Sequence, residues 1–249
     1  MQNNLTITEN KDFVIELAGV PIGIKPWKAK YMKYFCKGYL SSKEPCFILQ
    51  PTEEAVRAEK ERSAGKKEWA NIRENTWERV VVYREIAERM PAYNTFLMHA
   101  SAVALEGNAY LFAGPSGAGK STHAGLWHQA FPEKLLIIND DKPLIKMEED
   151  RILVCGSPWC GKEGWNNNIS APLKAVFFIH QAEQNQISPL PRSQGFEALM
   201  NQVYLSRNPE NMQKTLGFVE ALTQRIPLYS LDCRMDQEAV STAYEAVKG

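Results

Sequence analysis

Nine consecutive residues carry the clearest chemistry in this chain of 249 residues. They form a complete phosphate-binding loop, GPSGAGKST, made of Gly114, Pro115, Ser116, Gly117, Ala118, Gly119, Lys120, Ser121 and Thr122. Glycines let backbone N–H groups approach a phosphate without an obstructing Cβ. Lys120 supplies a cation for the β- and γ-phosphates, and the Ser121 hydroxyl is placed to coordinate Mg²⁺ at a helix start. The motif predicts a nucleotide site, with a plain glycine-rich turn as the alternative.

Two adjacent carboxylates, Asp140 and Asp141, provide a second set of chemical groups. They follow the apolar run at residues 135–138, which predicts a buried strand that ends at the site. Asp140 comes twenty residues after Lys120, so one helix separates the pair from the loop. Neighbouring side chains on extended backbone point in different directions, so one carboxylate can face Mg²⁺ and the other an acceptor hydroxyl. The alternative is a β-turn or a helix cap, where Asp is common.

The elements that must position these residues alternate between strands and helices, which predicts an α/β fold. Strands are predicted at residues 13–17, 22–25, 46–49, 95–105, 108–113, 135–138, 144–147, 152–155, 175–180 and 227–231. Helices are predicted after Thr52, from Trp69 to Met90, and at residues 122–130, 196–205, 209–225 and 237–247, with Asn208 and Asp236 as N-caps.

The order of these features resembles HPr kinase/phosphorylase and, more distantly, ATP-dependent phosphoenolpyruvate carboxykinase. The resemblance covers residues 96–179: His99 in HASAV, a hairpin, the phosphate loop, one helix, and a strand ending in the Asp pair. It implies a P-loop domain with a mixed β-sheet and flanking helices, and ATP and Mg²⁺ as cofactors. Carried over by position, it implies that Asp141 is the general base, that Asp140 lies near the metal, and that His99 supports the base.

The chain also departs from that family. It has Ala100 where the family has Gly, Lys142 where it has Arg, and no glutamate-arginine-glycine signature. In its place stands GSPWCGKEGWNNN at residues 156–168, similar to HPr-kinase-like proteins of bacterial peptide-tailoring clusters. Its glycines, tryptophans and amides suit a surface that closes over a ligand.

Within this stretch, Glu163 is a candidate replacement for the missing glutamate near the metal. Lys162 is either a group that stabilises the transferred phosphoryl charge or a solvated loop lysine. Trp159 and Trp165 either stack on a ligand or bury the loop against the sheet.

Two domains are predicted. The strand and helix signals of the first part of the chain indicate a small α+β segment at residues 1–92, and the resemblance implies an HPr-kinase-like P-loop kinase domain at residues 93–249. Lys plus Arg and Asp plus Glu both number 29, which gives no electrostatic footprint for nucleic acid. The sequence shows no targeting or membrane-spanning segment, so a cytoplasmic protein without a membrane partner is expected. Five cysteines without a Cys-x-x-Cys pair argue against a disulfide framework and a structural zinc site.

These observations predict an ATP-dependent kinase that phosphorylates a hydroxyl group, with serine the expected acceptor, on a peptide, a carrier protein or a small molecule. Two alternatives stay open: phosphoenolpyruvate carboxykinase-type chemistry and a non-catalytic ATP-binding regulatory protein. The sequence also leaves homo-oligomerisation open.

Overall fold

A computed structural model of the chain describes residues 12–27, 32–65 and 73–248. The chain forms two compact units, Met1–Ile86 and Ala87–Gly249. The domain boundary predicted between residues 92 and 93 stays a prediction. None of the helices in the described ranges combines the length and the apolarity needed to cross a membrane.

The first unit contains a four-stranded sheet with the order β3-β1-β2-β4. Its strands are β1 (Phe13–Leu17), β2 (Val20–Ile24), β3 (Leu40–Ser41) and β4 (Phe47–Leu49). Its helices are α1 (Met32–Phe35), a 3₁₀ helix at Lys37–Tyr39, α2 (Glu53–Ser63) and α3 (Glu74–Arg89), which continues into the second unit. Thr52 caps α2 as predicted, because its side chain accepts a hydrogen bond from the Ala55 N–H at 3.2 Å. The predicted helix start at Trp69 lies outside the described residues.

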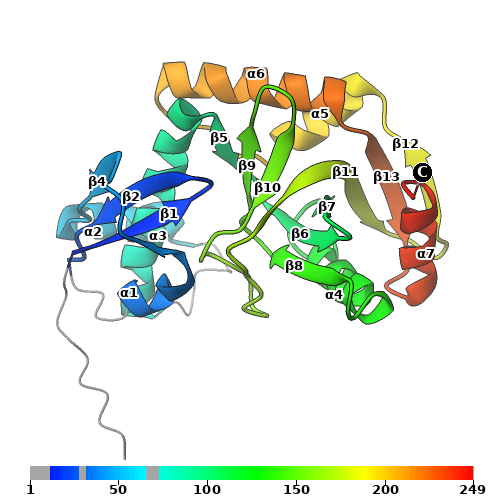
Figure 1. The fold of residues 1–249 in the computed structure, drawn as a ribbon, viewed down its shortest axis with the longest axis horizontal. Coiled ribbons are helices and arrows are strands. Elements are labelled where there is room, and N and C mark those ends of the chain that lie inside the picture. Colours follow the sequence, from blue (N-terminus) through cyan, green and yellow to red (C-terminus); the bar gives the residue numbers. More distant parts are fainter. Residues whose placement is uncertain (1–11, 28–31, 66–72, 249) are drawn as a thin grey trace, which may run out of the picture. The chain divides into compact units, whose positions relative to one another are not determined.

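The second unit is a mixed α/β structure (Figure 1). Its strands are β5 (Thr95–Leu97), β6 (Ala100–Leu105), β7 (Asn108–Ala113), β8 (Leu135–Asn139), β9 (Leu144–Met147), β10 (Ile152–Cys155), β11 (Ser170–Gln181), β12 (Gln186–Pro189) and β13 (Leu228–Cys233). Its helices are a 3₁₀ helix at Met90–Tyr93, α4 (Lys120–Ala130), α5 (Arg192–Met200), α6 (Pro209–Arg225) and α7 (Gln237–Glu245). The structure confirms the expected α/β class and the predicted N-caps of α6 and α7, Asn208 and Asp236.

The long strand β11 organises the sheet of this unit. The main strand order is β5-β9-β10-β11-β7-β6-β8, while β13 pairs with β11 and β12 with β13. The first residues of β11 pair antiparallel with β10, and its later residues pair parallel with both β7 and β13. The sheet therefore branches at β11, whose curved path is visible in Figure 1.

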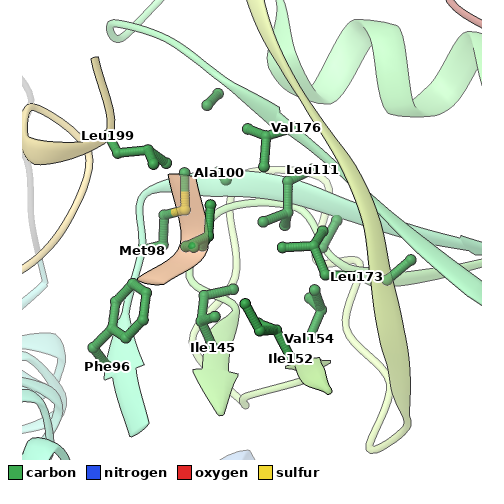
Figure 2. Close-up of a cluster of buried hydrophobic side chains, with 14 of the residues drawn as sticks. Phe96, Met98, Ala100, Leu111, Ile145, Ile152, Val154, Leu173, Val176 and Leu199 are labelled. Carbon is green, nitrogen blue, oxygen red and sulfur yellow. The ribbon is translucent and has the colours of Figure 1, made fainter. Parts of the chain in front are cut away.

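Alternate residues of β7 enter two separate cores, because successive side chains of a strand point to opposite faces. Ala109, Leu111 and Ala113 join a cluster that includes Leu199 of α5 and two residues of α6, Val219 and Leu222. Figure 2 shows Leu111 and Leu199 within this cluster. Tyr110 and Phe112 join a second cluster with α4 and α7. Helices therefore cover both faces of the sheet, as expected for an α/β domain.

Several predicted elements have other bounds in the structure, and for two of them the contacts give the physical reason. The strand predicted at residues 95–105 is two strands, β5 and β6, because Met98 and His99 leave the ladder. Their N–H groups bind the carbonyls of Pro143 (3.2 Å) and Gln202 (2.7 Å) instead. The helix predicted at residues 196–205 begins and ends earlier, as α5, because the chain after it turns to pair with this break through a bridge between Met98 and Val203.

One carboxylate near the start of the second unit, at the end of α3, is bound to the segment between α5 and α6. Glu88 accepts hydrogen bonds from the hydroxyls of Tyr204 (2.9 Å) and Ser206 (2.6 Å), and from the backbone N–H (2.8 Å) and Nε (3.1 Å) of Arg207. Burial raises the pKa of Glu88, but these donors outweigh burial and hold the pKa below its usual range.

The replacement Glu88→Gln should lower the free energy of unfolding by about 1–3 kcal/mol at pH 7, because it removes the charge from an acceptor that binds four donor groups. The pKa of Glu88 is lower in the folded than in the unfolded protein, where it is about 4.3. The stabilisation by the charged carboxylate is therefore present above a pH of about 4.3 and is lost as the pH falls through the pKa of the folded protein. Denaturant unfolding between pH 7 and pH 3.5 should therefore show the difference from wild type shrinking in acid. The exposed Glu220→Gln is the control, and a difference independent of pH would contradict the assignment.

Candidate active site

The site is assembled at one edge of the sheet of the second unit. Strands β7, β11 and β13 are parallel, and β8 runs in the same direction because both β7 and β8 are antiparallel to β6. The carboxyl ends of these strands therefore meet at one edge, where open α/β sheets bind ligands. Strand β7 leads there into the phosphate loop and β8 into the Asp pair.

The phosphate loop connects β7 to α4 through glycines with left-handed backbone. Gly114 has a φ of +143°, and a Cβ there would lie 3.1 Å from the Ile179 carbonyl oxygen of β11. Gly119, with a φ of +100°, is the N-cap of α4 and has no side chain to occupy the amides of the first turn. Free amides at a helix N-terminus bind anions. The loop therefore presents amides of the kind that bind anions at helix N-termini.

Lys120, the first residue of α4, folds back over this loop. Its ammonium donates to the carbonyl oxygens of Gly114 and Pro115, both at 3.0 Å. Burial lowers the pKa of Lys120, while the nearby Asp141 carboxylate raises it. The cation is thus held beside the loop backbone, where it can meet phosphate oxygens.

Asp140 is a buried carboxylate with one free oxygen. Its Oδ1 accepts a hydrogen bond from the Gly161 N–H at 2.6 Å, whereas its Oδ2 is buried without a hydrogen-bond partner among the described residues. Burial raises the pKa of Asp140 above its usual range, against the lowering effect of the Gly161 amide. A Cβ on Gly161 would lie 3.1 Å from Oδ2, so the close approach suits glycine.

The buried, unpaired Oδ2 of Asp140 fits a cation ligand. Ser121 and Glu163, the other two predicted metal residues, line the same cavity as Asp140. Among the described residues, no three His, Cys, Asp or Glu side chains are placed together to hold a metal ion. Mg²⁺ keeps several waters and is bound by one or two protein oxygens together with substrate phosphates. Asp140 and Ser121 fit that kind of site.

Asp141 has a different environment from its neighbour. Its Oδ1 lies 2.7 Å from Lys142 Nζ and 3.3 Å from His99 Nε2. Burial raises the pKa of Asp141, but His99 and the Lys142 ammonium outweigh burial and lower the pKa to about 2. Asp141 is therefore ionised at neutral pH. The contacts with His99 and Lys142 are both to Oδ1. Asp141 also lines the same cavity as Asp140.

A cavity of about 460 Å³ brings most of the predicted site residues together. His99, Lys120, Ser121, Asp140, Asp141 and Glu163 line it, as do four further loop residues, Ser116, Gly117, Gly119 and Thr122. The three predicted residues outside its lining are Gly114, Pro115 and Ala118. Gly161 and Lys162 complete the wall. The roles assigned to these residues stay predictions.

The stretch at residues 156–168 contributes to the site mainly through its backbone. The Trp165 carbonyl accepts a hydrogen bond from the Asp140 N–H at 3.1 Å, and the Trp165 ring lies against Gly125 of α4 and the second core. This packing favours the burying role of Trp165 over ligand stacking. Lys162 and Glu163 are exposed side chains at the cavity wall.

The sequence analysis did not identify Asn139 and Gly161 as site residues. Asn139 is a buried amide whose Oδ1 accepts the N–H groups of Asp141 (2.9 Å) and Lys142 (2.6 Å). The signal that could have indicated it is a polar amide at the end of an apolar strand, directly before the carboxylates. Gly161 carried no signal beyond its place in a glycine-containing stretch.

Comparisons with known proteins give one family match and a distant structural likeness. The family model described as "ScmC: SynChlorMet cassette protein ScmC" matches residues 64–241. No curated protein matches the chain. A solved structure described as the Hpr(Ser) kinase/phosphatase from Coxiella burnetii shares 9% identity and covers 61% of this chain and 99% of its own, with a TM-score of 0.33.

The contacts of Asp141 yield a titration test. The replacement Lys142→Met removes the ammonium at 2.7 Å and should raise the pKa of Asp141 from about 2 toward the ordinary value of about 3.9. Carboxyl ¹³C NMR titration of both proteins measures the change. The control Lys146→Met removes a lysine that pairs with Glu148 and should leave the Asp141 titration unchanged. An unaltered Asp141 pKa in Lys142→Met would show that Lys142 does not set it.

Proposed function

This chain belongs to the SynChlorMet cassette protein ScmC family, and we propose that it is a kinase that transfers the γ-phosphoryl group of ATP to a hydroxyl group. One observation carries the proposal. The phosphate loop with Lys120 and the ionised Asp141 line the same cavity, about 460 Å³ in volume. A phosphoryl donor and an acceptor hydroxyl need to be held side by side in this way for transfer.

On the donor side, the loop amides and the first turn of α4 bind the phosphates, and Lys120 exchanges its carbonyl partners for phosphate oxygens. Asp140 and Ser121 would hold Mg²⁺. When bound, that ion neutralises phosphate charge and orients the β- and γ-phosphates. The sequence resemblance to HPr kinase/phosphorylase supports the same assignment.

On the acceptor side, Asp141 is the base. As the acceptor oxygen bonds to the γ-phosphorus, the bond from that phosphorus to the β–γ bridging oxygen breaks and ADP leaves. The acceptor proton passes to the Asp141 carboxylate. With a pKa of about 2, Asp141 is ionised and able to accept the proton. Because the transition state of phosphoryl transfer is loose, positioning and charge stabilisation supply most of the catalysis. His99 and Lys142 keep Asp141 ionised and hold it by Oδ1.

The acceptor that we propose is the serine hydroxyl of a peptide. The support is the likeness of residues 156–168 to HPr-kinase-like proteins of bacterial peptide-tailoring clusters, together with the place of Gly161, Lys162 and Glu163 at the cavity wall. A peptide can lie along such an exposed wall and insert one short side chain. Carrier proteins and small molecules are the competing acceptors.

Two replacements separate phosphate binding from transfer. We expect Asp141→Asn to keep its affinity for ATP and to lose transfer by at least about 100-fold, because it removes the base. Lys120→Ala should lose both ATP affinity and transfer. Transfer of ³²P from γ-labelled ATP, with Mg²⁺, to pooled serine peptides and free hydroxyl metabolites measures turnover, and equilibrium dialysis measures ATP binding.

The matched controls are Asp150→Asn and Lys134→Ala, two exposed positions outside the cavity lining that should keep wild-type transfer. Label on peptides establishes both the kinase and its acceptor class. Tight ATP binding without transfer to any pool would instead favour a non-catalytic nucleotide-binding protein. ADP formation that depends on oxaloacetate would favour carboxykinase chemistry.

A further inference from the structure

Asn139, the last residue of β8, is a buried amide whose hydrogen-bonding groups are all used. Its Oδ1 accepts the N–H groups of Asp141 at 2.9 Å and Lys142 at 2.6 Å. Its Nδ2 donates to the carbonyl oxygens of Ser157 at 2.9 Å and Trp159 at 3.1 Å. A primary amide offers two donor hydrogens and two acceptor lone pairs, and here each meets a partner.

The two sides of this amide belong to different parts of the site. One side holds the turn that carries both carboxylates, and the other holds the chain that leads to Gly161. Ser157, also buried, strengthens the link because its hydroxyl donates to the Lys142 carbonyl at 2.7 Å. The Gly161 N–H then reaches Asp140 Oδ1 at 2.6 Å. Asn139 therefore ties the acid pair to the segment that orients Asp140.

We propose that Asn139 is a positioning residue for the transfer reaction, an inference that rests on the proposed function for its catalytic consequence. By fixing the distance between the acid pair and Gly161, it leaves Asp140 with one bound and one free oxygen. An amide is required because an aspartate would place negative charge against two carbonyl oxygens. An apolar residue would deprive the Asp141 and Lys142 N–H groups of this acceptor and would remove one donor from each of the Ser157 and Trp159 carbonyls.

The test uses Asn139→Leu and the milder Ser157→Ala in the full chain, so that one variant remains informative if the other fails to fold. Hydrogen exchange reports on the Gly161 amide, which should exchange at least about tenfold faster in both variants. Titration of ATP binding with Mg²⁺ is the second readout. The Mg²⁺ concentration for half-maximal effect should rise about 10- to 100-fold, while the Kd for ATP without Mg²⁺ stays at its wild-type value.

Asn167→Ala is the matched control. Its amide joins the same stretch to β8 by donating a hydrogen bond to the Ile137 carbonyl at 2.7 Å, two residues before Asn139. It should leave both readouts unchanged. Wild-type Gly161 exchange and Mg²⁺ dependence in a folded Asn139→Leu protein, or equal effects of Asn167→Ala, would overturn the proposal. If the wild-type protein binds no ATP, the proposed function fails, while the exchange measurement still decides whether Asn139 positions Gly161.

Discussion

The pairing of β6 with its two neighbours is the constraint on which the site depends. Ala100 lies opposite Ala113 of β7, and Ala102 lies opposite Asn139 of β8. This register places the start of the phosphate loop and the Asp pair at the same end of the sheet. A slip of two residues would preserve the faces of the strands but move one group by about 7 Å. The Ser101 hydroxyl reinforces the register by donating to the Asp140 carbonyl at 2.8 Å.

Local patterns were enough to predict much of this architecture from the sequence. Strand β7 and helix α6 have the predicted bounds, because the signals for each are local in the sequence. An apolar run marks β7, and an Asn-Pro pair marks the start of α6. The break between β5 and β6 is different. The apolar run continues through Met98, and the two carbonyls that draw the chain out of the ladder, from Pro143 and Gln202, are more than forty residues away. Nothing local could indicate that break.

The same division applies to the candidate site. The phosphate loop and the Asp pair are each contiguous in sequence, so their chemistry was visible without the structure. The contacts of Asn139 and Gly161 connect positions eighteen to twenty-one residues apart, and only the folded chain shows them. His99 was indicated by resemblance alone. It lies in the break between β5 and β6, 3.3 Å from Asp141.

The two adjacent carboxylates at this edge need compensating partners, because burying charge without compensation is strongly unfavourable. The fold treats them differently. Asp141 receives a lysine and a histidine, and its pKa falls to about 2. Asp140 receives one backbone amide, and burial holds its pKa above the usual range while Oδ2 stays unpaired. Environments that push two neighbouring pKa values apart assign them different roles. Asp141 is ionised, so it is able to accept a proton. Burial favours a protonated Asp140, and a cation bound at its unpaired Oδ2 would stabilise the carboxylate in place of that proton.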